Sequence, residues 1–269
     1  MPEYESINGQ EYIVIDDSNY QQYLNEAAAD GRVAGIIPRK SAIGELELQP
    51  GMYAAVLAEK FPLIPESQWK DRIAAMQGRF ARQRNEAAGV KDCSQGSFGY
   101  CWAFSLAQCI QSAHVAAGRP HIELGAESLG GAVNWRNQGY YLDGAIAYAV
   151  KHGIASRAFI PNLNINPKSF KSRWEVDAML HRPIATEIFD GGAKAIWAET
   201  VTTILSGYSV YMAYNWASHA LQIDELVIDS KGEICPSLTN SWGPGQRWVI
   251  KGSKKIPSEL YVLRVATHY

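Results

Sequence analysis

A cysteine lies at the junction between a glycine-rich loop and an apolar run, in the stretch QGSFGYCWAFS at residues 95–105. The apolar run from Cys101 to Gly118 predicts a helix that begins at the cysteine. The free N–H groups and the dipole of a helix start favour the thiolate form of a cysteine, which is its nucleophilic form. Cys101 is therefore the candidate nucleophile. The alternative is that it is a small buried apolar residue, as many cysteines are.

The other three cysteines do not have this setting. Cys109 falls in the middle of the predicted helix and Cys235 precedes a proline, so we expect both to be buried apolar residues. Cys93 lies in the loop before Cys101, where a regulatory disulfide and no special role are both open. The chain has no CxxC pair, so we expect no metal site.

A reactive thiolate needs a general base, and histidine is the usual one. Among the six histidines, His219 starts a strand-like run and is flanked by small residues that leave room for a substrate. His219 is the predicted base. We expect structural roles for the remaining histidines, which are His114, His121, His152, His181 and His268.

Two further side chains could complete the chemistry. An imidazole base needs an orienting partner, and Asn240 in TNSWG offers an oxygen that Trp242 could shield from water. The alternative for this stretch is a plain turn. Acyl chemistry also needs donors for an oxyanion, and the side-chain amide of Gln95 is within reach if its loop folds back. The backbone N–H of Cys101 would be the second donor.

These stretches together resemble the papain-like cysteine proteases. The nucleophile loop QGSFGYCWAFS resembles the family's Q-G-x-C-G-x-C-W-A-F-S, SHAL its histidine segment and NSWG its asparagine segment. NQGYY at residues 137–141 resembles the segment that holds the substrate backbone. Asn240 follows Cys101 by 139 residues, within the family's spacing of roughly 130–150.

The resemblance implies an α+β fold with two lobes, a helical one and a β-barrel-like one, and an N-terminal extension. It implies that Cys101 attacks a peptide carbonyl, that His219 protonates the leaving amine and that Asn240 orients His219. Gln95 would hold the oxyanion. The substrate-binding residues implied in the same way are Gly139, Tyr140, Ala217 and Trp242.

Three departures from the family pattern stand out. Phe98 occupies the position of the family's disulfide cysteine, three residues before the nucleophile. The sequence PGQRW after NSWG changes the edge of the expected cleft. Residues 1–61 lack the pattern expected of a papain-type inhibitory propeptide, so we predict either a docking arm or a non-standard prosegment.

The predicted organisation has three parts. Residues 1–61 form the extension, residues 62–165 a helical lobe with the nucleophile, and residues 166–269 a β-rich lobe with the histidine and asparagine. A seam is expected in the Pro- and Asn-rich stretch 160–170. Residues 66–88 predict one amphipathic helix whose charged side is solvated, with a binding patch as the alternative. Further helices are predicted for ESLGGAVNW, 143–153 and 193–206, and strands or an irregular wrap for 34–56. Strands are predicted for EYIVI, SVYMAY, HALQIDELVID, RWVIKG and ELYVLRV.

Composition narrows the function classes further. The chain has 269 residues, 47% hydrophobic content and a formal net charge of −2, which gives no indication of nucleic acid or an anionic membrane as partner. It contains no run of about 18 apolar residues, and its acidic start is unlike a signal peptide. We expect a reduced protein, cytoplasmic or otherwise intracellular, that needs no cofactor.

Three functions remain open at this point. The first is a cysteine peptidase that acts on a peptide or protein substrate. The second is a papain-fold component of a larger assembly, with little or no turnover, that docks through residues 1–88. The third is an acyl transferase that uses the same Cys–His pair with an amine as acceptor.

Overall fold

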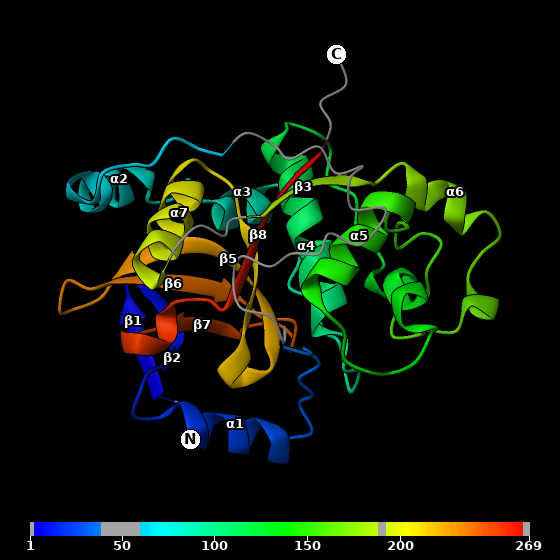
Figure 1. The fold of residues 1–269 in the computed structure, drawn as a ribbon, viewed down its shortest axis with the longest axis horizontal. Helices are drawn as coiled ribbons and strands as arrows, with labels where there is room; N and C mark the ends of the chain where they lie inside the picture. Colours follow the sequence, from blue (N-terminus) through cyan, green and yellow to red (C-terminus); the bar gives the residue numbers. More distant parts are fainter. Residues whose placement is uncertain (1–2, 39–59, 188–191, 266–269) are drawn as a thin grey trace.

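A computed structural model describes residues 3–38, 60–187 and 192–265 (Figure 1). The helices of residues 101–116, 142–152 and 174–179 lie on one side of the molecule, and most of a large sheet lies on the other side together with further helices. The helices are α1 (Tyr20–Ala29), α2 (Trp69–Met76), α3 (Ala81–Ala87), α4 (Cys101–Ala116), α5 (Leu142–His152), α6 (Trp174–Met179) and α7 (Ala193–Leu205). The strands are β1 (Glu3–Ile7), β2 (Gln10–Ile15), β3 (Pro183–Glu187), β4 (Val210–Tyr214), β5 (His219–Ile228), β6 (Ile234–Thr239), β7 (Arg247–Ile250) and β8 (Glu259–Val265).

The strands form one sheet in the order β1-β2-β7-β6-β5-β4-β8-β3. Side chains of a strand alternate between its two faces, and β4 is buried on both. Tyr211 and Ala213 of β4 join the apolar core around α4 and α5. Val210 and Met212 join the second core, beneath α2 and α7. The central strands therefore tie the helical lobe to the β lobe.

Residues 3–31 are built into the β lobe. Asn8 and Gly9 both have positive φ, as a tight β-hairpin turn requires, and they join β1 to β2. β2 then pairs in parallel with β7. Tyr23 of α1 packs edge-on against Trp248 of β7, and the Trp248 Nε1–H donates to its hydroxyl at 3.0 Å. This part of the predicted extension is thus part of the β lobe.

The prediction of one helix over residues 66–88 is wrong. A short 3₁₀ turn, α2 and α3 share this range, and the chain bends between the helices where Gly78 has φ +73°. The predicted apolar stripe is nevertheless buried, because Trp69, Ile73 and Phe80 all enter the sheet-side core.

Arg82 corrects the prediction of a solvated charged face. Its side chain is only 3% exposed and lies 2.7 Å from Asp224 and 3.5 Å from Glu225, both on β5. The Tyr12 hydroxyl of β2 donates to Glu225 in turn. A buried guanidinium is tolerated where carboxylates neutralise it. This network joins α3, β5 and the N-terminal hairpin.

Several other predicted elements are confirmed. The helix over 101–117 begins at Cys101 and ends before Gly118, and those over 143–153 and 193–206 correspond to α5 and α7. ESLGGAVNW forms a 3₁₀ helix rather than an α-helix. Strands β1, β3 and β6 were not anticipated; β6 contains Pro236, a residue that argues against a strand.

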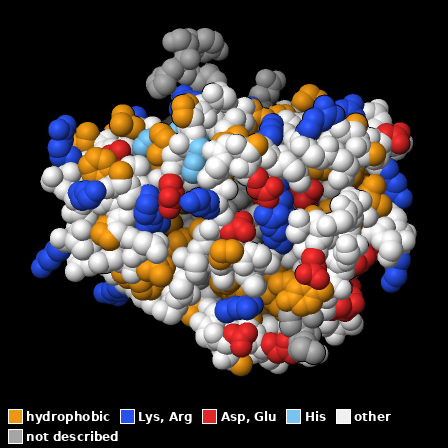
Figure 2. Space-filling view, turned by 180° about the vertical axis from the view of Figure 1, so that it is seen from behind, with side chains coloured by type: hydrophobic (Ala, Val, Ile, Leu, Met, Phe, Trp, Pro, Cys, Tyr) orange, Lys and Arg blue, Asp and Glu red, His pale blue; other side chains and the backbone are white. Residues whose placement is uncertain are grey.

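The three-part division of the chain remains a prediction, and contacts cross both of its borders. Phe170 and Trp174 pack edge-on against Trp135 of the helical side, so the chain beyond the predicted seam first continues there. The wrap predicted within 34–56 lies partly, and His268 wholly, outside the described residues. None of the described helices is long and apolar enough to cross a membrane. Acidic and basic side chains are interspersed on the face seen in Figure 2.

Candidate active site

Cys101 is the first residue of α4 and is completely buried. Its sulfur lies 3.5 Å from the backbone nitrogen of Ala220 on β5. Burial raises the pKa of the thiol to about 11, although backbone hydrogen bonds from Ala220 and Gly35 oppose this shift. The cysteine is therefore protonated in this conformation, despite its place at a helix start.

His219 begins β5, one residue before the amide that contacts the sulfur. Its Nε2 lies 2.8 Å from Asn240 Oδ1, as predicted for an orienting partner. Its Nδ1 is buried and has no hydrogen-bond partner among the described residues. The Trp242 ring packs 4.4 Å from the imidazole, centroid to centroid. Burial lowers the pKa of His219 to about 4, so the ring is neutral at pH 7.

Gln95 is fully buried and its loop does fold back. The Nε2 group donates to the carbonyl of Phe98 at 2.6 Å and to that of Val33 at 2.9 Å. The Oε1 atom accepts from the Ser241 hydroxyl, which fixes the orientation of the amide. Ser241 was not singled out in the sequence, although it lies between Asn240 and Trp242 in the NSWG motif.

A segment of the chain itself occupies the space between the two lobes. We call residues 33–37 the strap. On the helical side, Tyr140 N donates to Gly35 O at 3.0 Å and Ile37 N donates to Tyr140 O at 3.2 Å. These bonds form a parallel bridge centred on Ile36 and Tyr140. Tyr140 thus binds an extended backbone, a role that the resemblance implied for its neighbour Gly139, and this backbone is the protein's own.

The strap also contacts the β lobe. Ile36 N donates to the carbonyl of Ser218 at 2.9 Å, a residue whose φ of +47° is unusual for a serine. The Val33 carbonyl accepts a second hydrogen bond from Trp242 Nε1 at 3.2 Å. The strap therefore bonds to the side chain of Gln95, to Trp242 and to both flanks of the cleft.

Gly35 is the tightest point of the strap. A Cβ atom on Gly35 would lie 2.0 Å from the carbonyl oxygen of Gly99, and one on Gly139 would lie 2.6 Å from the carbonyl oxygen of Gly35. Three glycine backbones therefore meet beside Cys101. The backbone N–H of Gly35 interacts with the Cys101 sulfur and opposes the rise in its pKa.

Phe98 occupies the position where the papain-like family has a disulfide cysteine, and its ring packs there instead. All four cysteines are described and unpaired. The Phe98 ring is half-buried, lies 6.1 Å from that of Tyr100 and rests against the helical-side core. Its backbone N–H donates to the carbonyl of Gln95 at 3.1 Å, so the loop is closed by backbone and amide hydrogen bonds together.

The remaining predicted binding residues differ in position. The Tyr140 ring packs 5.3 Å from Trp102. Ala217 precedes Ser218 and packs in the sheet-side core, whereas Tyr140 lies against the helical-side core. Sequence reasoning also missed Tyr211, whose buried hydroxyl donates to the Trp102 carbonyl at 2.8 Å and so supports the first turn of α4.

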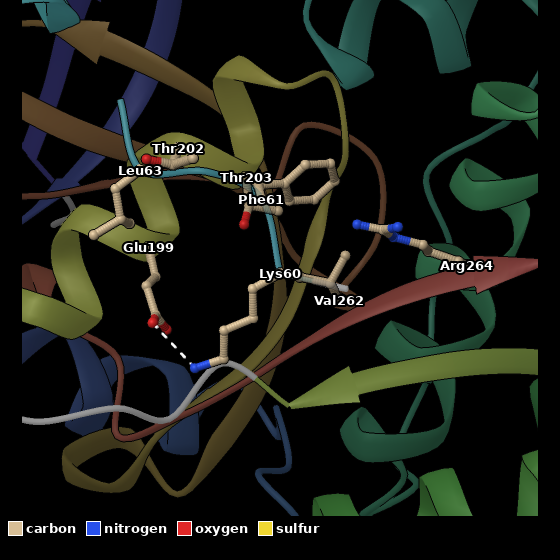
Figure 3. A pocket seen from close by; sticks show the side chains of 8 residues that line it. All are labelled: Lys60, Phe61, Leu63, Glu199, Thr202, Thr203, Val262 and Arg264. Atoms are coloured by element: carbon tan, nitrogen blue, oxygen red, sulfur yellow. Dashed lines mark hydrogen bonds and ion pairs between the residues drawn. The ribbon is translucent and has the colours of Figure 1, made fainter. Parts of the chain in front are cut away.

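A separate cavity of about 220 Å³ lies between residues 60–63, α7 and β8 (Figure 3). Lys60 forms an ion pair with Glu199 at 3.2 Å, and the Arg264 guanidinium lies 4.4 Å from the centre of the Phe61 ring. The residues that line it include none of the candidate catalytic groups. The cavity lies where residues 60–63 pack against α7 and β8 of the β lobe.

One cluster among the described residues has the donors of a metal site. Ligand atoms of Asp229, Glu233 and Cys235 lie within 4.8 Å of one another. Lys251 is 3.1 Å from Asp229 and Lys255 is 2.9 Å from Glu233. Because lysines already neutralise both carboxylates, this cluster gives no support for a bound cation.

Comparison with known proteins identifies the fold. No protein-family model and no curated protein sequence matches the chain. Among solved structures, digestive procathepsin L 3 of Tenebrio molitor larval midgut matches with a TM-score of 0.54 and 16% identity, over 91% of this chain and 87% of that one. Xylellain, a cysteine protease from Xylella fastidiosa, matches with a TM-score of 0.54 and 14% identity, over 87% and 96%.

A third match is the proform of Amb a 11, a cysteine protease and ragweed pollen allergen, with a TM-score of 0.51 and 15% identity. This match covers 68% of the present chain and 64% of the allergen. At these identities the likeness is one of fold. The chain has the α+β fold of the papain-like cysteine proteases, in a sequence that has diverged far from the structures it matches.

Proposed function

We propose that this protein is a cysteine-type peptidase that the strap holds in a latent form. The observation that carries the proposal is the hydrogen bond from Gln95 Nε2 to the Val33 carbonyl at 2.9 Å. The predicted oxyanion donor already binds a peptide carbonyl beside Cys101. The carbonyl of a peptide substrate would take that place when the strap leaves.

The first half of the reaction would proceed on an open cleft. There His219 accepts the thiol proton, and the Cys101 sulfur attacks the carbonyl carbon of the scissile peptide bond. Gln95 Nε2 and the Cys101 backbone N–H donate to the oxyanion of the tetrahedral intermediate. The C–N bond breaks as the imidazolium returns its proton to the leaving amine, which leaves a thioester on Cys101.

Water completes the turnover. Neutral His219 removes a proton from water, whose oxygen attacks the thioester carbonyl. Collapse of the second tetrahedral intermediate releases a carboxylic acid and the thiolate, and the proton stays on the imidazole. Asn240 keeps Nε2 engaged throughout, so Nδ1 is the nitrogen that exchanges protons with sulfur, amine and water.

The protonation states support latency. A working pair needs a thiolate or easy access to one, yet burial raises the pKa of Cys101 and lowers that of His219. Both shifts favour the uncharged pair while the strap excludes water. Two of the structural matches are likewise described as a proform and a procathepsin.

One observation favours the second candidate, a component of an assembly with little turnover. Cys101 and His219 are both completely inaccessible in this conformation. If the strap never leaves, the fold serves only as a scaffold, and docking through residues 1–88 remains a proposal. Among the described residues of 1–88, exposed side chains that could dock lie on the edge strand β1 and on the outward sides of α1, α2 and α3.

The test is covalent labelling by a peptide that carries a thiol-reactive electrophile. Gly35→Ala should displace the strap, so we expect one adduct per molecule in that variant and none after a further Cys101→Ala change. Ala34→Ser is the matched control, because Ala34 is exposed in the same segment. If Gly35→Ala folds, exposes Cys101 to a small alkylating reagent and still neither binds nor cleaves peptides, the scaffold function is favoured instead.

A further inference from the structure

A second cavity, of about 410 Å³, lies at the far end of α4 from Cys101. The last turns of α4, the loop after it and the turn after α6 supply its walls. His114 follows Cys101 by thirteen residues of the same helix, which places it about 20 Å from the nucleophile. The cavity is therefore separate from the cleft, and a ligand bound in it would not depend on the proposed peptidase activity.

Three buried nitrogen atoms on the residues of this cavity lack partners. His114 and His181 are only 5% and 6% exposed. His114 Nε2, His181 Nδ1 and one terminal nitrogen of Arg119 have no hydrogen-bond partner among the described residues. Buried polar groups are nearly always hydrogen-bonded. The Arg119 nitrogen is a donor and the His114 nitrogen can be one, so these two atoms indicate a ligand that accepts hydrogen bonds.

The charge of the cavity suits a monoanion. Burial lowers the pKa of His114 to about 4 and also lowers that of His181, so both rings are neutral at pH 7. Arg119 then supplies one positive charge. The nearest carboxylate, Asp177, lies 3.8 Å from the other ring nitrogen of His181 and accepts from the backbone N–H of Ser156. Because a carboxylate only accepts, the hydrogen of the neutral His181 ring is on the nitrogen that faces Asp177, and Nδ1 is an acceptor.

The rim of the cavity is apolar. Pro120, Ile122 and Leu180 line it, and Leu180 is 70% exposed while Ile122 is 37% exposed. Together these side chains give one side of the cavity an apolar border. A ligand for this cavity would combine an acidic head with an apolar body.

We propose that this cavity binds a monocarboxylate with a short apolar side chain, either a free acid or the C-terminus of a peptide. The carboxylate would accept from Arg119 and from the Nε2–H group of the neutral His114 ring, and the apolar side chain would cover Ile122 and Leu180. The neutral imidazoles and the single guanidinium together distinguish this site from a phosphate site, which needs more positive charge.

The test uses the full chain with defined probes. N-acetyl-leucine and the peptide Ala-Ala-Leu represent the two sources, and N-acetyl-leucine amide is the control without a carboxylate. We expect saturable binding with a Kd below about 1 mM, seen by calorimetry and as shifts of the His114 and His181 ring nitrogens by NMR. Whichever of the two acids binds with the lower Kd shows whether the ligand is a free acid or a peptide C-terminus.

Variants decide whether the cavity is responsible. Arg119→Gln should weaken binding at least tenfold, and His114→Gln should weaken it several-fold, while His121→Gln should leave it unchanged because His121 contacts Gln111 outside this cavity. Equal binding of the amide, equal binding by the Arg119→Gln protein, or the absence of any shift would overturn the proposal. Saturable binding of Zn²⁺ alone to both histidines would overturn it as well.

Discussion

Residues 3–31 and the strap are consecutive in the chain, yet they are held in opposite ways. The first segment is held by side chains, since Tyr12, Ile13, Ile15 and Tyr23 are all at most 5% exposed. The strap is held mainly by backbone hydrogen bonds to Tyr140, Ser218, Gln95 and Trp242, and its closest packing is between glycines.

The difference indicates which part can move. Removing buried apolar side chains from a core costs several kcal/mol, whereas a backbone hydrogen bond that can be exchanged for one to water contributes only about 1 kcal/mol. The N-terminal hairpin therefore belongs to the folded domain. The strap can leave the cleft while the hairpin that precedes it stays in place.

The largest effect is expected in the anchored segment. Tyr23→Ala removes a buried ring and its contact with Trp248, so the free energy of unfolding should fall by about 3 kcal/mol. Tyr4→Ala, at a side chain that is 56% exposed, should change it by less than about 0.5 kcal/mol. Urea denaturation measures both. Equal effects would mean that the hairpin is a loosely attached arm after all.

Acid should release the strap while the hairpin stays protected. The pKa of His219 is about 4 in the closed form and about 6.5 when the ring is exposed. The open form therefore gains a proton first as pH falls through 6.5, and the closed form loses stability down to pH 4. Opening should increase on the order of 50-fold between pH 7 and 4.5.

Amide hydrogen exchange measures this opening. The rates are expressed as protection factors, which correct for the pH dependence of the intrinsic exchange rate. Protection at residues 35–37 should fall over this range, while that of β2 should follow global unfolding only. In a His219→Gln protein, the protection of the strap should no longer fall with pH through this histidine. Any part of the pH dependence that comes from His114 should remain. Parallel loss of protection in both segments would contradict the distinction between them.

The Gly35→Ala variant tests the strap at its closest contact. The added Cβ would meet the Gly99 carbonyl, and overpacking of this kind costs about 2 kcal/mol. Alkylation of Cys101 should accelerate roughly 30-fold, with the midpoint of unfolding of the β lobe unchanged. A matched rate in Gly35→Ala and Ala34→Ser proteins would show that this glycine contact does not close the cleft.

The smallest effect is expected from a single strap hydrogen bond. Trp242→Phe removes the donor to the Val33 carbonyl and keeps a ring over His219. Loss of about 1 kcal/mol should lower the strap's protection about five-fold. No change would indicate that Gln95 alone holds that carbonyl.

The sequence was informative where chemistry is carried by side chains in short motifs. Cys101, Asn240, Gln95 and Trp242 were each identified by residue type and local pattern, and the fold brings them together with His219 as expected. Their catalytic roles remain part of the proposal. The helix start at Cys101 was predictable for the same reason, because a loop of turn residues precedes an apolar run.

The strap could not be predicted in this way. Most of its contacts are made by its own backbone, and Ile36 is its one side chain buried in a core. The sequence VAGII carries no pattern that distinguishes a cleft-filling segment from a strand. Arg82 was misassigned because Asp224, its closest partner on β5, lies 142 residues further along the chain. The break at Gly78 was missed because an apolar stripe continues across it. These features depend on tertiary contacts, which local periodicity does not record.

We propose that Cys101 is a competent nucleophile beneath a removable strap. Intact-mass measurement after incubation with the peptide electrophile tests it most directly, in wild-type, Gly35→Ala and Gly35→Ala/Cys101→Ala proteins. We expect slow labelling of the wild-type protein and fast labelling of the Gly35→Ala protein at a single site that maps to Cys101. The Gly35→Ala/Cys101→Ala protein should not be labelled. A folded Gly35→Ala protein that is not labelled, or is labelled only at Cys93, would contradict it.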